Sequence, residues 1–300
     1  MIAVLVLALA SVDAGPSEEP PVRSVKFLYD IRIVQNERVA EVRLRVKQDA
    51  PALRQLRFHI DPDRHLSFSG DGDLLRTEDD DGEVYLAWQV PGGGGELTWT
   101  SRIEHLRDPR SYDARMTTSW ALFRGSDVVP PAASSFSAGS QSTGRVRFDL
   151  PKKWKLVTQH RERESGGYSL EDDRFFLRPA GWFMTGRIRT LNFKERDLEV
   201  TLATTRRLGA DLVDVRTFLR FTLPHLLEVL GRTPDRLVVV SGPDPMWRGG
   251  LSGPKSLYLH KDRPLVSPDG TSPILHELVH VLSEAKAGQD GDWVVEGLAE

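Results

Sequence analysis

Apolar and polar residues alternate along several segments between residues 25 and 205. The alternation is clearest at 25–33, 84–90 and 97–103, where most alternate positions are apolar. Successive side chains of a strand point to opposite faces of its sheet, so this period predicts strands with one buried and one solvated face. Shorter segments of strand character follow at 146–150, 155–158 and 198–202. The pattern predicts an antiparallel β-sandwich or saddle.

The period of the apolar pattern changes near residue 206. From there to residue 230, apolar residues recur every three or four positions, which is the spacing of one helix face. Pro224 predicts a kink in this helix, and Gly231 predicts its end. Two buried strands are expected next, at 237–240 and 256–260. We therefore divide the chain into a leader and linker at 1–22, a β-rich domain at 23–205 and a mixed domain at 206–300.

Composition and charge narrow the possible functions. Three hundred residues exceed the usual size of one domain, and a hydrophobic fraction of 39% is enough for a substantial core. The net charge of -3 gives no broad basic field for nucleic acid, and the acidic run at 78–83 is expected to be a solvated turn. The chain has no cysteine, which leaves no disulfide framework and argues against thiol catalysis.

The first residues suggest export. An apolar run at 2–10 is followed by small residues up to Gly15, which resembles a signal-peptide core with a cleavage site after Ala14. No basic residue precedes the run, and it is too short to span a bilayer. We expect a periplasmic or secreted bacterial protein with no stable membrane span. The sequence leaves the oligomeric state open.

The segment HELVH at 276–280 carries the clearest chemistry in the chain. His276 and His280 are four residues apart, so on a helix they share one face and can reach one ion, while Glu277 lies beside them as a candidate general base. Ser272 is a suitable N-cap, and Pro273 suits the first turn. The apolar side of this helix, which predicts that it is buried, consists of Ile274, Leu275, Leu278, Val279 and Leu282.

A zinc site of this type needs a third protein ligand and keeps a fourth position open for water or substrate. Our candidate is Glu296, in the segment WVVEGLAE. Glu300 follows one helical turn later and could accept the second N–H of a ligating histidine. In the alternative interpretation Glu296 only favours the positive end of a helix dipole, and Glu300 is solvated. The expected cofactor is one Zn²⁺ per chain.

HELVH followed by EGLAE resembles the gluzincin metallopeptidases, the clan of thermolysin, with a layout similar to the glycyl and alanyl aminopeptidase-like families. The resemblance implies that His276, His280 and Glu296 bind zinc and that Glu277 activates water. It also implies an α+β fold, in which the β-sandwich or saddle precedes a thermolysin-like zinc peptidase domain truncated at its C-terminus. Fifteen residues separate His280 from Glu296, fewer than in thermolysin or the alanyl aminopeptidases.

The segment WRGGLSG at 247–253 occupies the place where aminopeptidase relatives carry a glycine-rich motif with an acidic residue for the free amine of the substrate. Here that position is Ser252, and a neutral hydroxyl does not form an ion pair with an ammonium group. An extended peptide could still pair with this backbone as an added strand. The candidate substrate-binding residues are Gly249, Gly250, Leu251 and Ser252, and an ordinary glycine turn is the alternative.

The sequence therefore predicts a zinc-dependent metallopeptidase, an aminopeptidase-like hydrolase acting on a peptide or protein, in which Glu277 activates a zinc-bound water. Two alternatives stay open. One is a catalytically inactive peptide-binding or scaffold module that retains the metallopeptidase fold. The other is a different zinc hydrolase, because HExxH specifies activated water rather than a peptide bond. The choice between endo- and exopeptidase cleavage also stays open.

Overall fold

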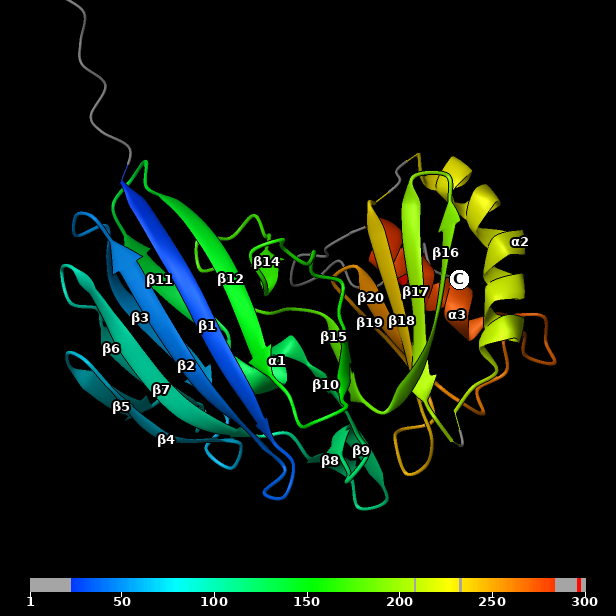
Figure 1. Ribbon diagram of the computed structural model, residues 1–300, viewed down its shortest axis with the longest axis horizontal. Coiled ribbons are helices and arrows are strands. Elements are labelled where there is room, and N and C mark those ends of the chain that lie inside the picture. The colour runs from blue at the N-terminus through cyan, green and yellow to red at the C-terminus, as the bar shows by residue number, and fades with distance from the viewer. Residues whose placement is uncertain (1–22, 208, 232–233, 284–295, 298–300) are drawn as a thin grey trace, which may run out of the picture.

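The computed structural model describes residues 23–207, 209–231, 234–283 and 296–297. Within them the chain forms four β-sheets and three helices, with 50% of residues in strands and 14% in helices. Figure 1 shows the sheets of the N-terminal half at one end of the molecule and the sheet that carries the two longer helices at the other end.

Two sheets of the N-terminal half enclose the first core. In spatial order the six-stranded sheet is β14 (Tyr168–Leu170), β12 (Gln141–Asp149), β1 (Ser24–Val34), β2 (Val39–Gln48), β7 (Gly94–Arg102) and β4 (His65–Gly70). The four-stranded sheet is β11 (Ala132–Phe136), β3 (Leu53–Ile60), β6 (Val84–Gln89) and β5 (Leu74–Glu78). Phe27 and Phe58 each meet the ring of Phe176 edge to face, with ring centroids 5.3 and 5.7 Å apart. Along β1, β6 and β7, buried residues alternate with more exposed ones, which confirms the predicted strands at 25–33, 84–90 and 97–103.

A third sheet joins this core to the rest of the chain. Its strands are β13 (Lys155–Val157), β15 (Trp182–Gly186), β10 (Trp120–Arg124), β9 (Ser111–Met116) and β8 (His105–Asp108), and the short helix α1 (Gly125–Val128) follows β10. Phe123 and Phe183 of the central strands face the first core, whereas Trp182 and Met184 face the other way. Both faces of this sheet are therefore covered, so β10 and β15 are apolar throughout most of their length.

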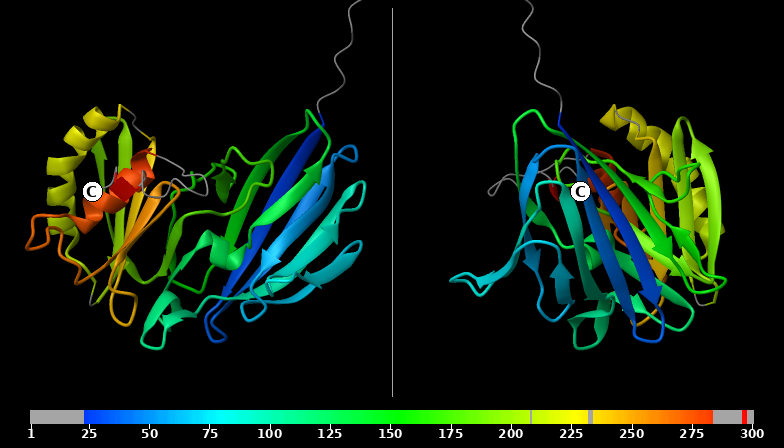
Figure 2. Two further views of the ribbon diagram at one scale, coloured as in Figure 1. Left: turned by 180° about the vertical axis from the view of Figure 1, so that it is seen from behind. Right: turned by 60° about the vertical axis from the view of Figure 1, so that its left-hand side comes forward.

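The fourth sheet carries the two longer helices. Its order is β16 (Ile188–Glu195), β17 (Leu198–Thr205), β18 (Arg236–Gly242), β20 (Ser256–His260) and β19 (Gly250–Gly253). The strand β18 runs parallel to both β17 and β20, and the edge strand β19 is antiparallel to β20. Helices α2 (Leu212–Leu230) and α3 (Pro273–Ser283) share a core with one face of this sheet, and Figure 2 shows α3 lying across it. Trp182 and its neighbours cover the other face.

Local signals explain where α2 begins and ends. The side chain of Asp211 accepts a hydrogen bond from Val213 N at 2.8 Å, so it satisfies a free N–H of the first turn. Gly231 ends the helix in the left-handed conformation with φ 63°, which glycine adopts without steric cost. The predicted helix and its stop at Gly231 are confirmed. The helix connects the parallel strands β17 and β18, as the crossover between parallel strands requires.

The prediction of an α+β fold that ends in a thermolysin-like peptidase domain is wrong. After residue 206 the described residues contain α2 and α3 as regular helices, and the segments around them pair as strands of a mixed sheet. Strands β18 and β20 are apolar runs buried along nearly their whole length, as expected for strands covered on both faces. The expected antiparallel order also fails at one pair, since β1 runs parallel to β12. Side-chain alternation carries no information on strand direction.

The expected domain boundary at residues 205 and 206 falls inside the fourth sheet. The hairpin of β16 and β17 precedes this boundary, and β18 follows it, yet β17 and β18 are paired neighbours. None of the helices in the described residues is long and apolar enough to cross a bilayer. The predicted leader at 1–22 lies outside the described residues.

Candidate metal centre and active site

Helix α3 positions three of the predicted site residues. It begins at Pro273, after Ser272, whose hydroxyl oxygen accepts a hydrogen bond from Leu275 N at 3.4 Å. The predicted helix and its N-terminal signals are confirmed. Its apolar side packs into the second core, which leaves His276, Glu277 and His280 only partly buried. The helix therefore presents these three side chains at the border between core and solvent.

The two histidines and Glu296 form one cluster. Nε2 of His276 lies 3.3 Å from Oε2 of Glu296, and Nε2 of His280 lies 3.7 Å from Oε1. The two Nε2 atoms are 3.2 Å apart. A tetrahedral zinc ion with ligand bonds of about 2.0–2.1 Å separates its ligand atoms by about 3.3–3.4 Å. The spacing and chemistry of these three donors therefore fit a zinc ion.

A second group of possible metal ligands exists within the described residues, at Asp244, His260 and Asp262. Arg248 donates from two nitrogens to the carboxylate of Asp244, and Lys261 lies 2.7 Å from that of Asp262. Nδ1 of the buried His260 accepts the N–H of Asp262, which leaves the proton of the neutral ring on Nε2, 3.4 Å from Asp244. This group is already compensated in charge, and its imidazole presents a donor, so it does not suit a cation.

Glu277 lies next to the cluster and contacts strand β19. The hydroxyl and the backbone N–H of Ser252 favour the ionised form of its carboxylate. Burial raises the pKa of the Glu277 carboxyl above its usual range, while His276, Ser252 and His280 oppose that rise. A carboxylate with a raised pKa, next to two imidazoles, is suited to accept a proton.

The glycines of the predicted substrate-binding segment have steric roles. A Cβ on Gly250 would lie 2.9 Å from Cγ of Glu277, so glycine at this position lets α3 and β19 approach closely. A Cβ on Gly249 would overlap the ring of Trp247 at 2.1 Å. Gly250, Leu251 and Ser252 lie on β19, and Gly249 directly precedes the strand and accepts the N–H of His260. The structure thus brings this segment beside Glu277.

Trp182 supports the same segment and was not predicted as a site residue. Its indole N–H donates to the carbonyl oxygen of Leu251 at 2.9 Å, and its backbone N–H donates to the hydroxyl of Ser256 at 2.8 Å. Trp182 therefore joins β15 of the third sheet to both β19 and β20. The sequence could indicate only that a buried tryptophan needs an acceptor for its indole N–H, and it could not indicate which residue supplies that acceptor.

A cavity of about 1380 Å³ lies beside the cluster, between the N-terminal sheets and the fourth sheet. Its lining includes Ser252, His280 and Glu296 from the site, and Thr143, Arg163 and Ser169 from the N-terminal half. The predicted partner residue Glu300 lies outside the described residues.

The fold is similar to that of two larger solved proteins. It is similar to an aminopeptidase N family protein from Idiomarina loihiensis, with a TM-score of 0.62 and 12% identity over 86% of this chain and 47% of that one. It is also similar to yeast leukotriene A4 hydrolase in complex with bestatin, with a TM-score of 0.52 and 11% identity over 86% of this chain and 44% of that one. The chain thus spans about half the length of these structures, and at such identity the likeness concerns the fold. Neither a scan against protein-family models nor a search of curated proteins found a match.

Proposed function

We propose that the chain carries the active site of a zinc-dependent peptidase. The observation that supports this most is the cluster of His276, His280 and Glu296, with Glu277 and the edge of β19 directly beside it. The similarity of the fold to an aminopeptidase N family protein and to a leukotriene A4 hydrolase supports a hydrolase of this kind. Export to the periplasm or the outside of the cell belongs to the same proposal and rests on the apolar run at 2–10.

The chemistry divides between the ion and the side chains. Zn²⁺ held by the two histidines and Glu296 would supply Lewis acidity, which polarises a carbonyl and makes water more acidic. Glu277 takes the proton of the attacking water and passes it to the leaving amine. The hydroxyl and the backbone N–H of Ser252 favour the ionised form of the Glu277 carboxylate, which is the form that takes up the proton. A general base is most effective when its pKa lies near the working pH, and the raised pKa of Glu277 is closer to neutral pH than that of an ordinary glutamate.

Strand β19 positions the substrate. It forms the edge of the fourth sheet, and within the described residues its one paired neighbour is β20. An extended peptide added at such an edge pairs through its backbone, which aligns it without reading its sequence. The scissile bond would then lie close to Glu277 and the metal cluster.

Metal analysis and a peptide library test this proposal together. We expect about one zinc per wild-type chain, loss of the zinc in His276→Ala/His280→Ala, and retention of the zinc without turnover in Glu277→Gln. A folded wild type that binds no zinc after incubation with the ion contradicts the proposal. Zinc binding with peptide capture but no cleavage, unchanged in Glu277→Gln, instead supports the peptide-binding module. Turnover of another ester or amide, without peptide cleavage, supports a different zinc hydrolase.

A further inference from the structure

The outer face of the six-stranded sheet carries a dense group of cations, which we call the basic patch. Lys26 of β1 lies opposite Lys47 of β2. Leu28, the next residue of β1 on the same face, lies between Arg45 of β2 and Arg145 of β12. Asp30, the following residue on this face of β1, lies between Arg43 and Arg147. The members of the basic patch are Lys26, Arg43, Arg45, Lys47, Arg145 and Arg147.

Most of this positive charge is uncompensated. Asp30 pairs with Arg45, and Glu96 pairs with Arg43 at 3.3 Å. The other four cations form no ion pair with the described residues. The net charge of the chain is -3, so this local excess of cations runs against the overall balance.

The arrangement also costs stability. Like charges that face each other across a strand pair are destabilising, and Lys26 faces Lys47. Arg145 is partly buried, and this burial, followed by repulsion from Arg147 and Arg163, lowers the pKa of its guanidinium. A fold that holds repelling cations together on one exposed face gains from an anionic partner that neutralises them.

The basic patch is continuous with the cavity beside the metal cluster. Thr143 of the cavity lining lies opposite Lys26, and Ser169 of the same lining lies opposite Arg145. Arg163 donates to the hydroxyl of Ser169 at 3.3 Å and also lines the cavity. A chain bound on the patch can therefore continue into the cavity, which reaches Ser252, His280 and Glu296.

We propose that the basic patch captures an acidic segment of the peptide substrate and directs the neighbouring residues into the cavity. This inference rests on the proposed peptidase function. Rows of cations along a strand are about 6.6–6.8 Å apart, which equals two residues of an extended peptide, so acidic residues at alternate positions match them. The exposed large apolar side chains of the described residues lie outside β1, β2 and β12, so the patch offers no exposed large apolar side chain for a lipid surface.

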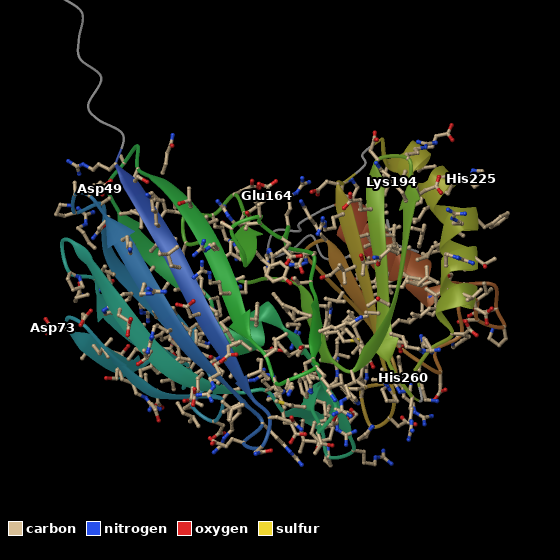
Figure 3. All side chains as sticks on the ribbon, in the orientation of Figure 1. Asp49, Asp73, Glu164, Lys194, His225 and His260 are labelled. Carbon is tan, nitrogen blue, oxygen red and sulfur yellow. The ribbon has the colours of Figure 1, made fainter. Side chains whose placement is uncertain are left out.

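Fluorescence anisotropy with a dye-labelled peptide tests the patch without any turnover. The peptide carries glutamate at alternate positions, and the protein is the full chain with Glu277→Gln, which keeps the peptide intact. We expect Lys26→Glu/Lys47→Glu to weaken binding about tenfold or more and to reduce its dependence on salt. The control Lys194→Glu/Arg216→Glu has the same change of charge, on β16 and α2, and should change affinity less than about twofold. Figure 3 labels Lys194 at the end of the molecule away from β1.

Several outcomes overturn this inference. They are no binding of the acidic peptide to the parent protein, an equal loss in the control variant, and patch-dependent binding of phosphatidylserine vesicles without binding of the peptide. If the double variant does not fold, peptide binding is measured with Lys26→Glu alone. This single variant should fold, because it places a carboxylate opposite Lys47 and relieves a repulsion. The readout is binding, so a failure of the peptidase proposal, seen as absent zinc or absent turnover, is distinguishable from a failure of the patch.

Discussion

The contact between Gly250 and Glu277 allows a test of the site that needs no substrate. In Gly250→Ala the new Cβ lies 2.9 Å from Cγ and 3.3 Å from Oε1 of Glu277, so one of the two elements must move by about half an ångström to reach ordinary contact. Overpacking of this kind costs about 1–3 kcal/mol, and the lower chain entropy of alanine returns about 0.4–1 kcal/mol. We expect a net loss of about 1–2 kcal/mol in the free energy of unfolding.

Thermal or denaturant unfolding of a double-mutant cycle measures this cost. The loss should appear as a fall in Tm of roughly 2–6 °C in Gly250→Ala and should shrink in the background of Glu277→Ala, which removes Cγ and the carboxylate. The matched control is Gly253→Ala on the same strand, whose Cβ would meet its nearest atom at 3.4 Å. An equal cost in both backgrounds would refute the packing of β19 against Glu277. In an active enzyme the displaced carboxylate should also lower kcat by about 10²-fold with zinc content unchanged.

Three further predictions concern the supports of the site and of the core. Ser252→Ala removes a hydroxyl that lowers the pKa of Glu277, so the acid limb of the profile of kcat/KM against pH should move to higher pH, and Ser252→Thr should restore it. Trp182→Phe removes the N–H that donates to Leu251 and should cost about 1 kcal/mol in the free energy of unfolding, with faster amide exchange in β19 if the contact holds that strand. Burial lowers the pKa of His65 to about 4, so the unfolded chain binds its proton first. Above about pH 6.5 the imidazole is neutral in both states and costs nothing. As the pH drops to 4, the preference of the proton for the unfolded chain lowers the free energy of unfolding by about 3 kcal/mol. Denaturant titrations of His65→Asn should show a flatter dependence on pH.

Local patterns in the sequence predicted local structure well. The strand at 256–260 and the helix that ends at Gly231 needed only apolar period and stop signals. The helix that carries HELVH was equally predictable, since its N-cap, its proline and its apolar side all lie between residues 272 and 282, around the motif. The structure also brings Glu296 close to the two histidines.

Contacts between distant segments could not be predicted in the same way. Trp182 contacts Leu251, which lies 69 residues further along the chain, and no motif around either residue predicts this contact. The contact of Ser252 with Glu277 depends on the place of β19 at the edge of its sheet, which follows from three-dimensional pairing rather than from apolar period. The basic patch arises from strands far apart in the sequence, so the small net charge of the chain conceals it.

The parallel pairing of β1 with β12 constrains the order of events during synthesis. The first residues of β1 lie opposite Gln141, so roughly a hundred residues must leave the ribosome before this edge of β1 finds its partner. At about 5–20 residues per second, that interval lasts several seconds to some tens of seconds. Throughout it, the backbone groups along one side of β1 are free to pair with another nascent chain. Slow translation between β2 and β12 would therefore increase aggregation of this protein, whereas binding of a chaperone to the nascent β1 edge would reduce it.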